Sequence, residues 1–263
     1  MVMERLHKIL AAAGIDSRRN CEQLILQGSV RVNGKVVDTL PAFADIDRDV
    51  IVVDGRKIHS VKKVYYLFNK PKGVICTNDD PQGRRKAIDF IDTDQRIFCA
   101  GRLEADTTGA IVLTNDSALA DRLTHPRYCL EKTYLVEIRG RITAEIIEKF
   151  KKGMWFSEGR SAPAKLKVLK SSEKESVIEV RIGQSLNRQI QRIMARLDYK
   201  VMAIKRTHIG NISLHRLGVG DYRPLTENEI EYLKKENRAE TPMVPAGGHF
   251  RKKRIKTHRN SKF

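Results

Sequence analysis

The stretch GRLEADTTGAIVLTND, residues 101–116, joins a glycine-framed loop to an apolar strand. Gly101 and Gly109 bracket the loop, so the side chains between them are expected to project at the end of a strand. The segment AIVLTND reads as that strand. Acids in such loops usually form turns, and this is the role we expect for Asp116. Asp106 could cap a turn in the same way, unless the surrounding sequence gives it another function.

Strands and helices alternate on both sides of this stretch. Upstream, VYYLFNKPKGVICT begins as an apolar strand that stops at residues 70–73, KPKG. Downstream, strands are expected in KTYLVEIRG, AKLKVLKSS and SVIEVRIG, and helices in ITAEIIEKFKKG, NRQIQRIMARL and TENEIEYLKKEN. The last helix has Thr226 as N-cap and Glu229 in the capping-box position. This order predicts an α+β domain on a mixed, mostly antiparallel sheet with flanking helices.

The first 60 residues have a pattern of their own. RLHKILAAAG keeps a helical apolar face, and Gly14 is expected to end that helix. Residues 16–17, Asp-Ser, supply N-cap candidates for a second helix, SRRNCEQLILQG. Asn-Gly at 33–34 and Asp-Gly at 54–55 are strong hairpin signals. Two short helices followed by hairpin strands predict a small αβ domain.

The charge balance indicates a polyanionic partner. The chain has 50 Lys and Arg against 32 Asp and Glu, a net charge of +18, and nucleic acid is the first candidate for such a surplus. No apolar run approaches the roughly 18 residues of a membrane span, and the first residues do not read as a secretory signal. The four cysteines are widely spaced, without CxxC or a neighbouring His pair. We therefore expect reduced thiols, no zinc site and a cytoplasmic protein.

These patterns divide the chain into four expected parts. Residues 1–60 form the small αβ domain, 61–64 a polar linker and 65–237 the α+β domain. Residues 238–263 are rich in Pro and Gly and then basic, with no apolar periodicity. This tail is predicted to be disordered and to add electrostatic affinity for nucleic acid.

The N-terminal pattern resembles the S-four type RNA-binding domain. The resemblance lies in RLHKILAAAGIDSRRNCEQLILQGSVRVNGKVV and DVIVVDGRKI. In that family the basic side of the helix pair lies on structured RNA, which implies phosphate contacts and shape recognition. The basic residues expected to make this contact are Arg5, Lys8, Arg18, Arg19, Arg31 and Lys35.

Six blocks of the second region resemble one enzyme family. In chain order they are KPKGV, GRLEADTTGAIVLTND, LTHP, EKTYLVEIRG, NRQIQRIM and RTHIGNISLHRLGVGDYRPLT. They are similar to the bacterial ribosomal RNA pseudouridine synthases, the group of small-subunit enzyme A and large-subunit enzymes B, E and F. With the N-terminal domain, the resemblance covers residues 4 to about 235 and implies the pseudouridine synthase fold.

By this resemblance Asp106 matches the essential aspartate of the family, and Tyr134 matches the tyrosine that packs on the target base. Uridine isomerisation breaks the bond from ribose to N1 of uracil, turns the base and rejoins it through C5. No electron or outside group is exchanged, so the resemblance implies neither cofactor nor metal. The carboxylate would act as a nucleophile or as a base toward the ribose, and the sequence leaves both open. The target must leave its stack, and an aromatic ring with cations would hold it.

The helix NRQIQRIMARL departs from the family pattern at Gln191. Relatives usually carry Arg or Lys there, paired to the aspartate, and such a cation keeps a carboxylate ionised and oriented. Gln191 can donate a hydrogen bond but has no charge. Arg188 and Arg192 lie within one turn on the same face, so either is expected to make the pair and join the catalytic set.

Three further cations and one acid complete the expected site. Arg102 is assigned to the phosphate of the flipped nucleotide or to holding the loop. Lys70 and Lys72 are assigned to phosphates at the edge of the cleft. Glu104 stands where the family generally has Asp and keeps the charge.

The expected substrate is ribosomal RNA, free or in a ribosomal precursor particle. Asn187-Arg188 at the helix start favours 23S RNA, because the small-subunit enzyme tends to carry His-Gln there. We expect a monomer that needs no membrane. Two alternatives stay open: a non-catalytic RNA-binding or ribosome-assembly factor, for which Gln191 speaks, and the same chemistry on 16S RNA or transfer RNA.

Overall fold

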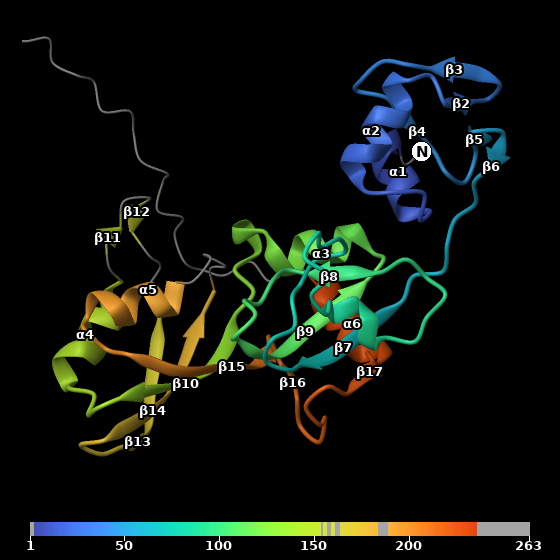
Figure 1. The fold of residues 1–263 in the computed structure, drawn as a ribbon. Helices are drawn as coiled ribbons and strands as arrows, with labels where there is room; N and C mark the ends of the chain where they lie inside the picture. Colours follow the sequence, from blue (N-terminus) through green and yellow to red (C-terminus); the bar gives the residue numbers. More distant parts are fainter. Residues whose placement is uncertain (1–2, 154, 157–158, 161–163, 184–188, 236–263) are drawn as a thin grey trace, which may run out of the picture.

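A computed structural model describes residues 3–153, 155–156, 159–160, 164–183 and 189–235. In this part of the chain a small N-terminal unit with its own core precedes a larger unit built on one long sheet (Figure 1). The expected tail at 238–263 and the boundary at 237 lie outside the described residues. No described helix is long and apolar enough to cross a membrane.

The N-terminal unit has the expected helix pair and hairpins. Ser17 caps the second helix by accepting the Asn20 N–H at 3.2 Å, and the Asn33-Gly34 turn has both residues at positive φ, as a tight hairpin requires. A second, Asp-Gly turn joins the other hairpin. The elements are β1 (Glu4–Arg5), α1 (Leu6–Ala12), α2 (Arg18–Leu26), β2 (Val30–Val32), β3 (Lys35–Val37), β4 (Phe43–Ala44), β5 (Ile51–Val53) and β6 (Arg56–Lys57).

The larger unit is a mixed, mostly antiparallel sheet in the order β13-β14-β10-β15-β9-β7-β17, with β16 on β15 and β8 on β9. The fold class is therefore the expected one. The strands are β7 (Tyr65–Lys70), β8 (Phe98–Ala100), β9 (Thr108–Thr114), β10 (Lys132–Arg139), β13 (Lys165–Ser171), β14 (Glu175–Ile182), β15 (Val201–Ile209), β16 (Ile212–Ser213) and β17 (Tyr222–Pro224); a separate pair is β11 (Trp155–Phe156) with β12 (Gly159–Arg160).

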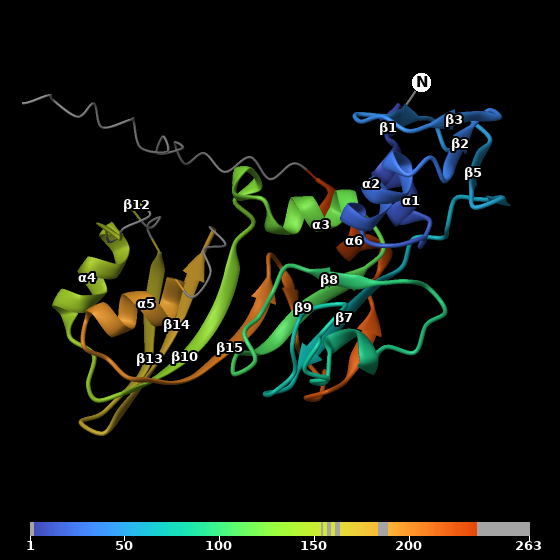
Figure 2. The ribbon, with the colours of Figure 1, turned by 45° about the horizontal axis from the view of Figure 1, so that its top comes forward.

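The sheet has two halves, and each half has its own hydrophobic core and its own helices. The α4 and α5 helices cover the β13-β14-β10 half, whereas α3 and α6 pack beside β8 and β9 (Figure 2). The capping box predicted at Thr226 and Glu229 is present at α6. The helices are η1 (Ala87–Phe90), α3 (Ser117–Thr124), η2 (Pro126–Tyr128), α4 (Ala144–Lys152), α5 (Gln189–Arg196) and α6 (Glu227–Lys234).

The two halves meet where β9 and β15 run parallel, with Arg206 beside Gly109. The backbones approach so closely that a Cβ on Gly109 would lie 2.2 Å from the Arg206 carbonyl oxygen. Only glycine fits such an approach, and its φ of +105° also favours glycine. The glycine expected to frame the Asp106 loop therefore also joins the two halves of the sheet.

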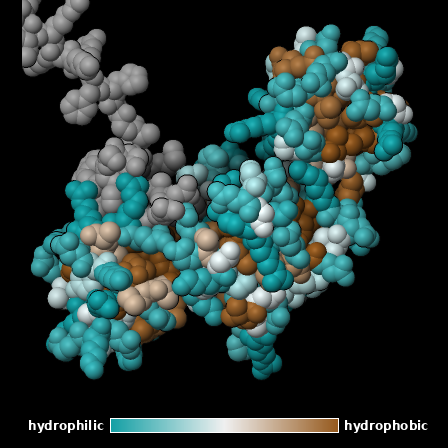
Figure 3. Space-filling model, in the orientation of Figure 1, coloured by the Kyte–Doolittle hydropathy of each residue, from teal (hydrophilic) through white to brown (hydrophobic). Residues whose placement is uncertain are grey.

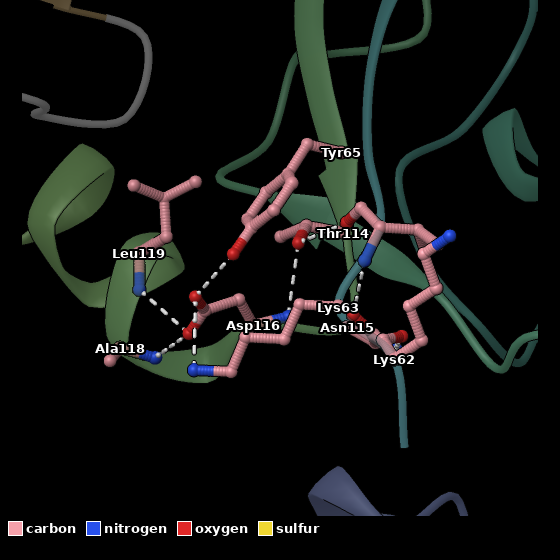
Figure 4. Close-up of polar contacts among 9 residues, drawn as sticks. Lys62, Lys63, Tyr65, Thr114, Asn115, Asp116, Ala118 and Leu119 are labelled. Carbon is pink, nitrogen blue, oxygen red and sulfur yellow. Dashed lines mark hydrogen bonds and ion pairs between the residues drawn. The ribbon is translucent and has the colours of Figure 1, made fainter. Parts of the chain in front are cut away.

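The other end of β9 clamps the segment that connects the two units (Figure 4). Asn115 accepts the Val64 N–H at 2.9 Å and donates to the Lys62 carbonyl at 2.9 Å. Asp116 accepts from Tyr65 Oη at 2.9 Å and lies 3.3 Å from Lys63 Nζ. The C-terminal end of the connecting segment is thus fixed to the long sheet of the larger unit.

Asp116 does more than the turn formation expected of it. Its Oδ1 accepts the N–H groups of Ala118 and Leu119, which makes it the N-cap of α3. Burial opposes its ionisation, but the hydrogen bond from Tyr65 and the charge of Lys63 outweigh that effect and lower its pKa. Burial and the hydrogen bond to Asp116 raise the pKa of Tyr65.

Candidate active site

The Asp106 loop is a tight turn with an exposed carboxylate. Thr107 N–H donates to the Glu104 carbonyl at 3.1 Å, and Gly73 N–H donates to the Ala105 carbonyl at 2.7 Å. Leu103 is buried below the loop, whereas Asp106 and Arg102 are exposed. The loop therefore holds its backbone by hydrogen bonds and presents the Asp106 side chain to solvent.

Lys70 supports this loop from below instead of lying at the cleft edge. Its side chain is fully buried, and Nζ donates to the carbonyls of Val74 at 2.7 Å, Pro71 at 3.0 Å and Ala105 at 3.3 Å. Burial lowers the pKa of Lys70, and the nearby charge of Asp106 opposes that shift. The expected phosphate contact is wrong for Lys70, because its ammonium is enclosed by protein. Lys72, by contrast, is exposed.

Tyr134 lies at the junction of the two halves of the sheet. Tyr134 of β10 pairs with Arg206 of β15, and Arg206 pairs in turn with Gly109 of β9. Its half-buried ring packs both against the core under α5 and against the core that contains Leu103. The structure therefore brings Tyr134, Lys70 and the Asp106 loop into one region.

Two buried cations near Tyr134 received no role in the sequence analysis. Arg206 is 5% exposed; its Nε donates to the Ala110 carbonyl at 2.6 Å, while its Nη2 has no hydrogen-bond partner in the described part of the chain. Lys132 is also 5% exposed. Burial and then the charge of Arg206 lower the pKa of Lys132 to about 7. Lys132 lies in the block EKTYLVEIRG, and Arg206 lies in the block that begins RTHIG. A charged residue inside an otherwise apolar strand is the signal by which both could have been recognised as functional candidates.

A pair of thiols lies behind the loop. Cys76 accepts the Leu103 N–H at 3.4 Å, and its hydrogen bond with Cys99 lowers the pKa of Cys76. All four cysteines are free thiols. Among the described residues no group of His, Cys, Asp or Glu could hold a metal ion.

The remaining expected residues are partly placed. Gln191 and Arg192 are half-buried on α5, while Arg188 and Asn187 lie outside the described residues. The cations expected to bind RNA in the N-terminal unit stand in or beside β1, α1, α2 and the hairpin of β2 and β3. Of these, Lys8 is half-buried and the others are exposed: Arg5, Arg18, Arg19, Arg31 and Lys35.

An exposed carboxylate on the Asp106 loop, on a sheet that follows a basic helix-pair unit, fits an enzyme that acts on RNA. Residues 64–196 match the family described as RNA pseudouridylate synthase, and residues 4–40 match the S4 domain. The chain belongs to the RNA pseudouridylate synthase family and is an isomerase that acts on RNA.

Relatives extend this match over most of the chain. Ribosomal large subunit pseudouridine synthase B of Bacillus subtilis is 40% identical over 88% of this chain and 96% of its own length. The Pseudomonas aeruginosa protein of the same name is 35% identical over 89% of this chain and 63% of its own. A crystal structure of a pseudouridylate synthase, 30% identical, superposes with a TM-score of 0.64 over 87% of this chain and 99% of that one.

Proposed function

We propose that this enzyme converts specific uridines of ribosomal RNA, with 23S RNA preferred, to pseudouridine. The observation that supports the proposal is the row Tyr134–Arg206–Gly109: these three residues pair across β10, β15 and β9, so Tyr134 lies two strands from the glycine that ends the Asp106 loop. The relatives named as large-subunit synthases, from Bacillus subtilis and Pseudomonas aeruginosa, support the choice of RNA.

In this mechanism each side chain has a separate task. Asp106 acts on the ribose of the flipped uridine, as nucleophile or as base, while the glycosidic bond to N1 breaks. Tyr134 holds the detached uracil by stacking while C5 bonds to the ribose carbon that N1 has left; C5 then loses its proton and N1 gains one, so the atoms balance. Lys70 fixes the loop through the Ala105 carbonyl. Because the product is an isomer of the substrate, the residues need to supply no electron or group.

The N-terminal unit supplies affinity in this proposal. Its exposed cations neutralise phosphates of structured RNA, so binding weakens as salt rises. Lys72, Arg102 and Gln191 contact the target nucleotide or its neighbours from the catalytic unit. The protein works as a cytoplasmic monomer on ribosomal RNA or on a precursor particle.

Arg192 or Arg188 is proposed to pair with Asp106 in place of the missing charge at Gln191. A cation close to the Asp106 carboxylate would keep it ionised and oriented. Replacing each arginine by Ala tests the idea. Unchanged turnover in both variants would exclude it.

The function is tested by mapping pseudouridines in ribosomal RNA from cells with and without the Asp106→Asn variant. We expect one or a few 23S positions to lose the modification. If pseudouridine is lost only from 16S RNA or only from transfer RNA, that RNA is the substrate instead. Unchanged pseudouridine maps of all three RNAs would contradict catalysis by Asp106.

A further inference from the structure

The turn after α3 lies between the start of the Asp106 loop and the end of β14. A Cβ on Gly101, where the Asp106 loop begins, would be 3.2 Å from Thr124 Cγ2. A Cβ on Gly183, at the end of β14, would be 3.1 Å from the Cys129 carbonyl oxygen. The turn at 124–129 therefore borders Gly101, where the Asp106 loop begins, on one side and Gly183, at the end of β14, on the other.

This turn carries an ordered arginine on an aromatic ring. Arg127 Nη2 lies 2.9 Å from Asp121 Oδ2 and donates to Tyr128 Oη at 2.6 Å. Its guanidinium carbon is 4.5 Å from the centre of the Tyr128 ring. The His125 ring meets the same tyrosine edge-on, and Arg122 lies 5.6 Å from its centre. Aromatic, acid and hydroxyl groups thus hold one arginine in a fixed position.

Stability does not explain this arrangement. The Arg127 side chain is 56% exposed and that of Asp121 is 46% exposed, and exposed ion pairs contribute about 0–1 kcal/mol. Ordering a long side chain opposes even that gain. Both hydrogen bonds of the Arg127 guanidinium use Nη2, so Nε and Nη1 have no hydrogen-bond partner among the described residues. A guanidinium held with donors facing outward is suited to a phosphate oxygen.

We propose that Arg127, held by Tyr128 and Asp121, binds the RNA phosphodiester backbone beside the target uridine. This inference rests on the proposed function for its substrate. The position of the turn places the contact next to the Asp106 loop, so it orients the strand that enters the site. Arg127 is a binding residue here, and the chemical step does not depend on it.

The test measures binding and the chemical step separately for Arg127→Ala. The probe is an unmodified large-subunit ribosomal RNA transcript, with dissociation constants taken over a salt series and single-turnover rates at saturating RNA. We expect several-fold weaker binding, a slope of log affinity against log salt smaller by about 1, and an unchanged saturating rate. Tyr128→Phe keeps the ring but removes the bond to Arg127, and should give a smaller loss in the same direction.

Arg141→Ala is the matched control. Arg141 is 64% exposed, lies 3.2 Å from Glu173 and follows the far end of β10. Wild-type affinity and salt slope in Arg127→Ala, an equal loss in Arg141→Ala, or a lower saturating rate with normal binding would overturn the inference. If the wild-type enzyme forms no pseudouridine but binding still depends on Arg127, the proposed function fails and the contact stands.

Discussion

The two ends of β9 each carry an aspartate, and the two residues have opposite environments. Asp106, before the strand, is exposed on a loop held by backbone hydrogen bonds. Asp116, after the strand, is 4% exposed and accepts from a tyrosine hydroxyl and two backbone N–H groups. We propose chemistry for the carboxylate at one end of β9, whereas the carboxylate at the other end stabilises the fold, because the contacts of a carboxylate and not its residue type decide its role.

The largest expected effect is on catalysis by Asp106→Asn. The amide can neither attack the ribose nor accept a proton, so we expect pseudouridine formation to fall by at least ~10³-fold. The side chain is exposed, so the free energy of unfolding should change by about 0.5 kcal/mol or less. Rate assays and denaturant melts of the same preparation check both. A large loss of stability would mean that Asp106 is part of the scaffold.

The opposite result is expected for Asp116→Ala. The substitution removes a helix N-cap, worth about 1 kcal/mol, and the acceptor of the Tyr65 hydroxyl, worth about 1–3 kcal/mol. We expect the free energy of unfolding to fall by about 2–4 kcal/mol, with the single-turnover rate of the folded protein near wild type. Glu145→Ala, which removes an exposed carboxylate paired with Lys149, serves as the control. If Asp116→Ala destabilises the protein no more than Glu145→Ala does, the contacts of Asp116 with Tyr65 and with the start of α3 do not stabilise the fold.

The smallest effect separates the charge of Asp116 from its hydrogen bonds. Its pKa is lower in the folded than in the unfolded protein, so the unfolded state binds more protons as the pH falls. The resulting stabilisation is present above about pH 3.9 and is lost as the pH falls through the folded pKa. Asp116→Asn should therefore be about 1 kcal/mol less stable than wild type at pH 6, and the gap should narrow by pH 3. If the difference in free energy of unfolding between wild type and Asp116→Asn does not change with pH, the charge of Asp116 does not contribute to stability.

Local signals predicted much of the fold. The turns at 33–34 and 54–55, the Ser17 cap and the Thr226 capping box depend on neighbouring residues, and all are present. The 3.6-residue period also placed α5 correctly. Such features follow from short-range sterics and hydrogen bonds, which one sequence is enough to show.

The elements that assemble the site were harder to predict. No strand is predicted from the sequence at β15, in which Lys205, Arg206 and His208 interrupt the apolar pattern. No helix is predicted at α3 either. Lys70 is expected from the sequence to contact phosphates at the cleft edge; its burial depends on three carbonyls that only the folded loop brings together. Long-range contacts of this kind leave little trace in local periodicity.

The clamp at Asn115 also sets the length of the tether between the two units. On one side, Ile58 N–H is bonded to the Ile51 carbonyl at 2.9 Å; on the other, the Lys62 carbonyl is held by Asn115. The chain free between these anchors can span at most about 14 Å. When one unit rests on an RNA, so short a tether keeps the other at an effective concentration on the order of millimolar. Two weak contacts can then act together, and avidity substitutes for a single tight binding surface.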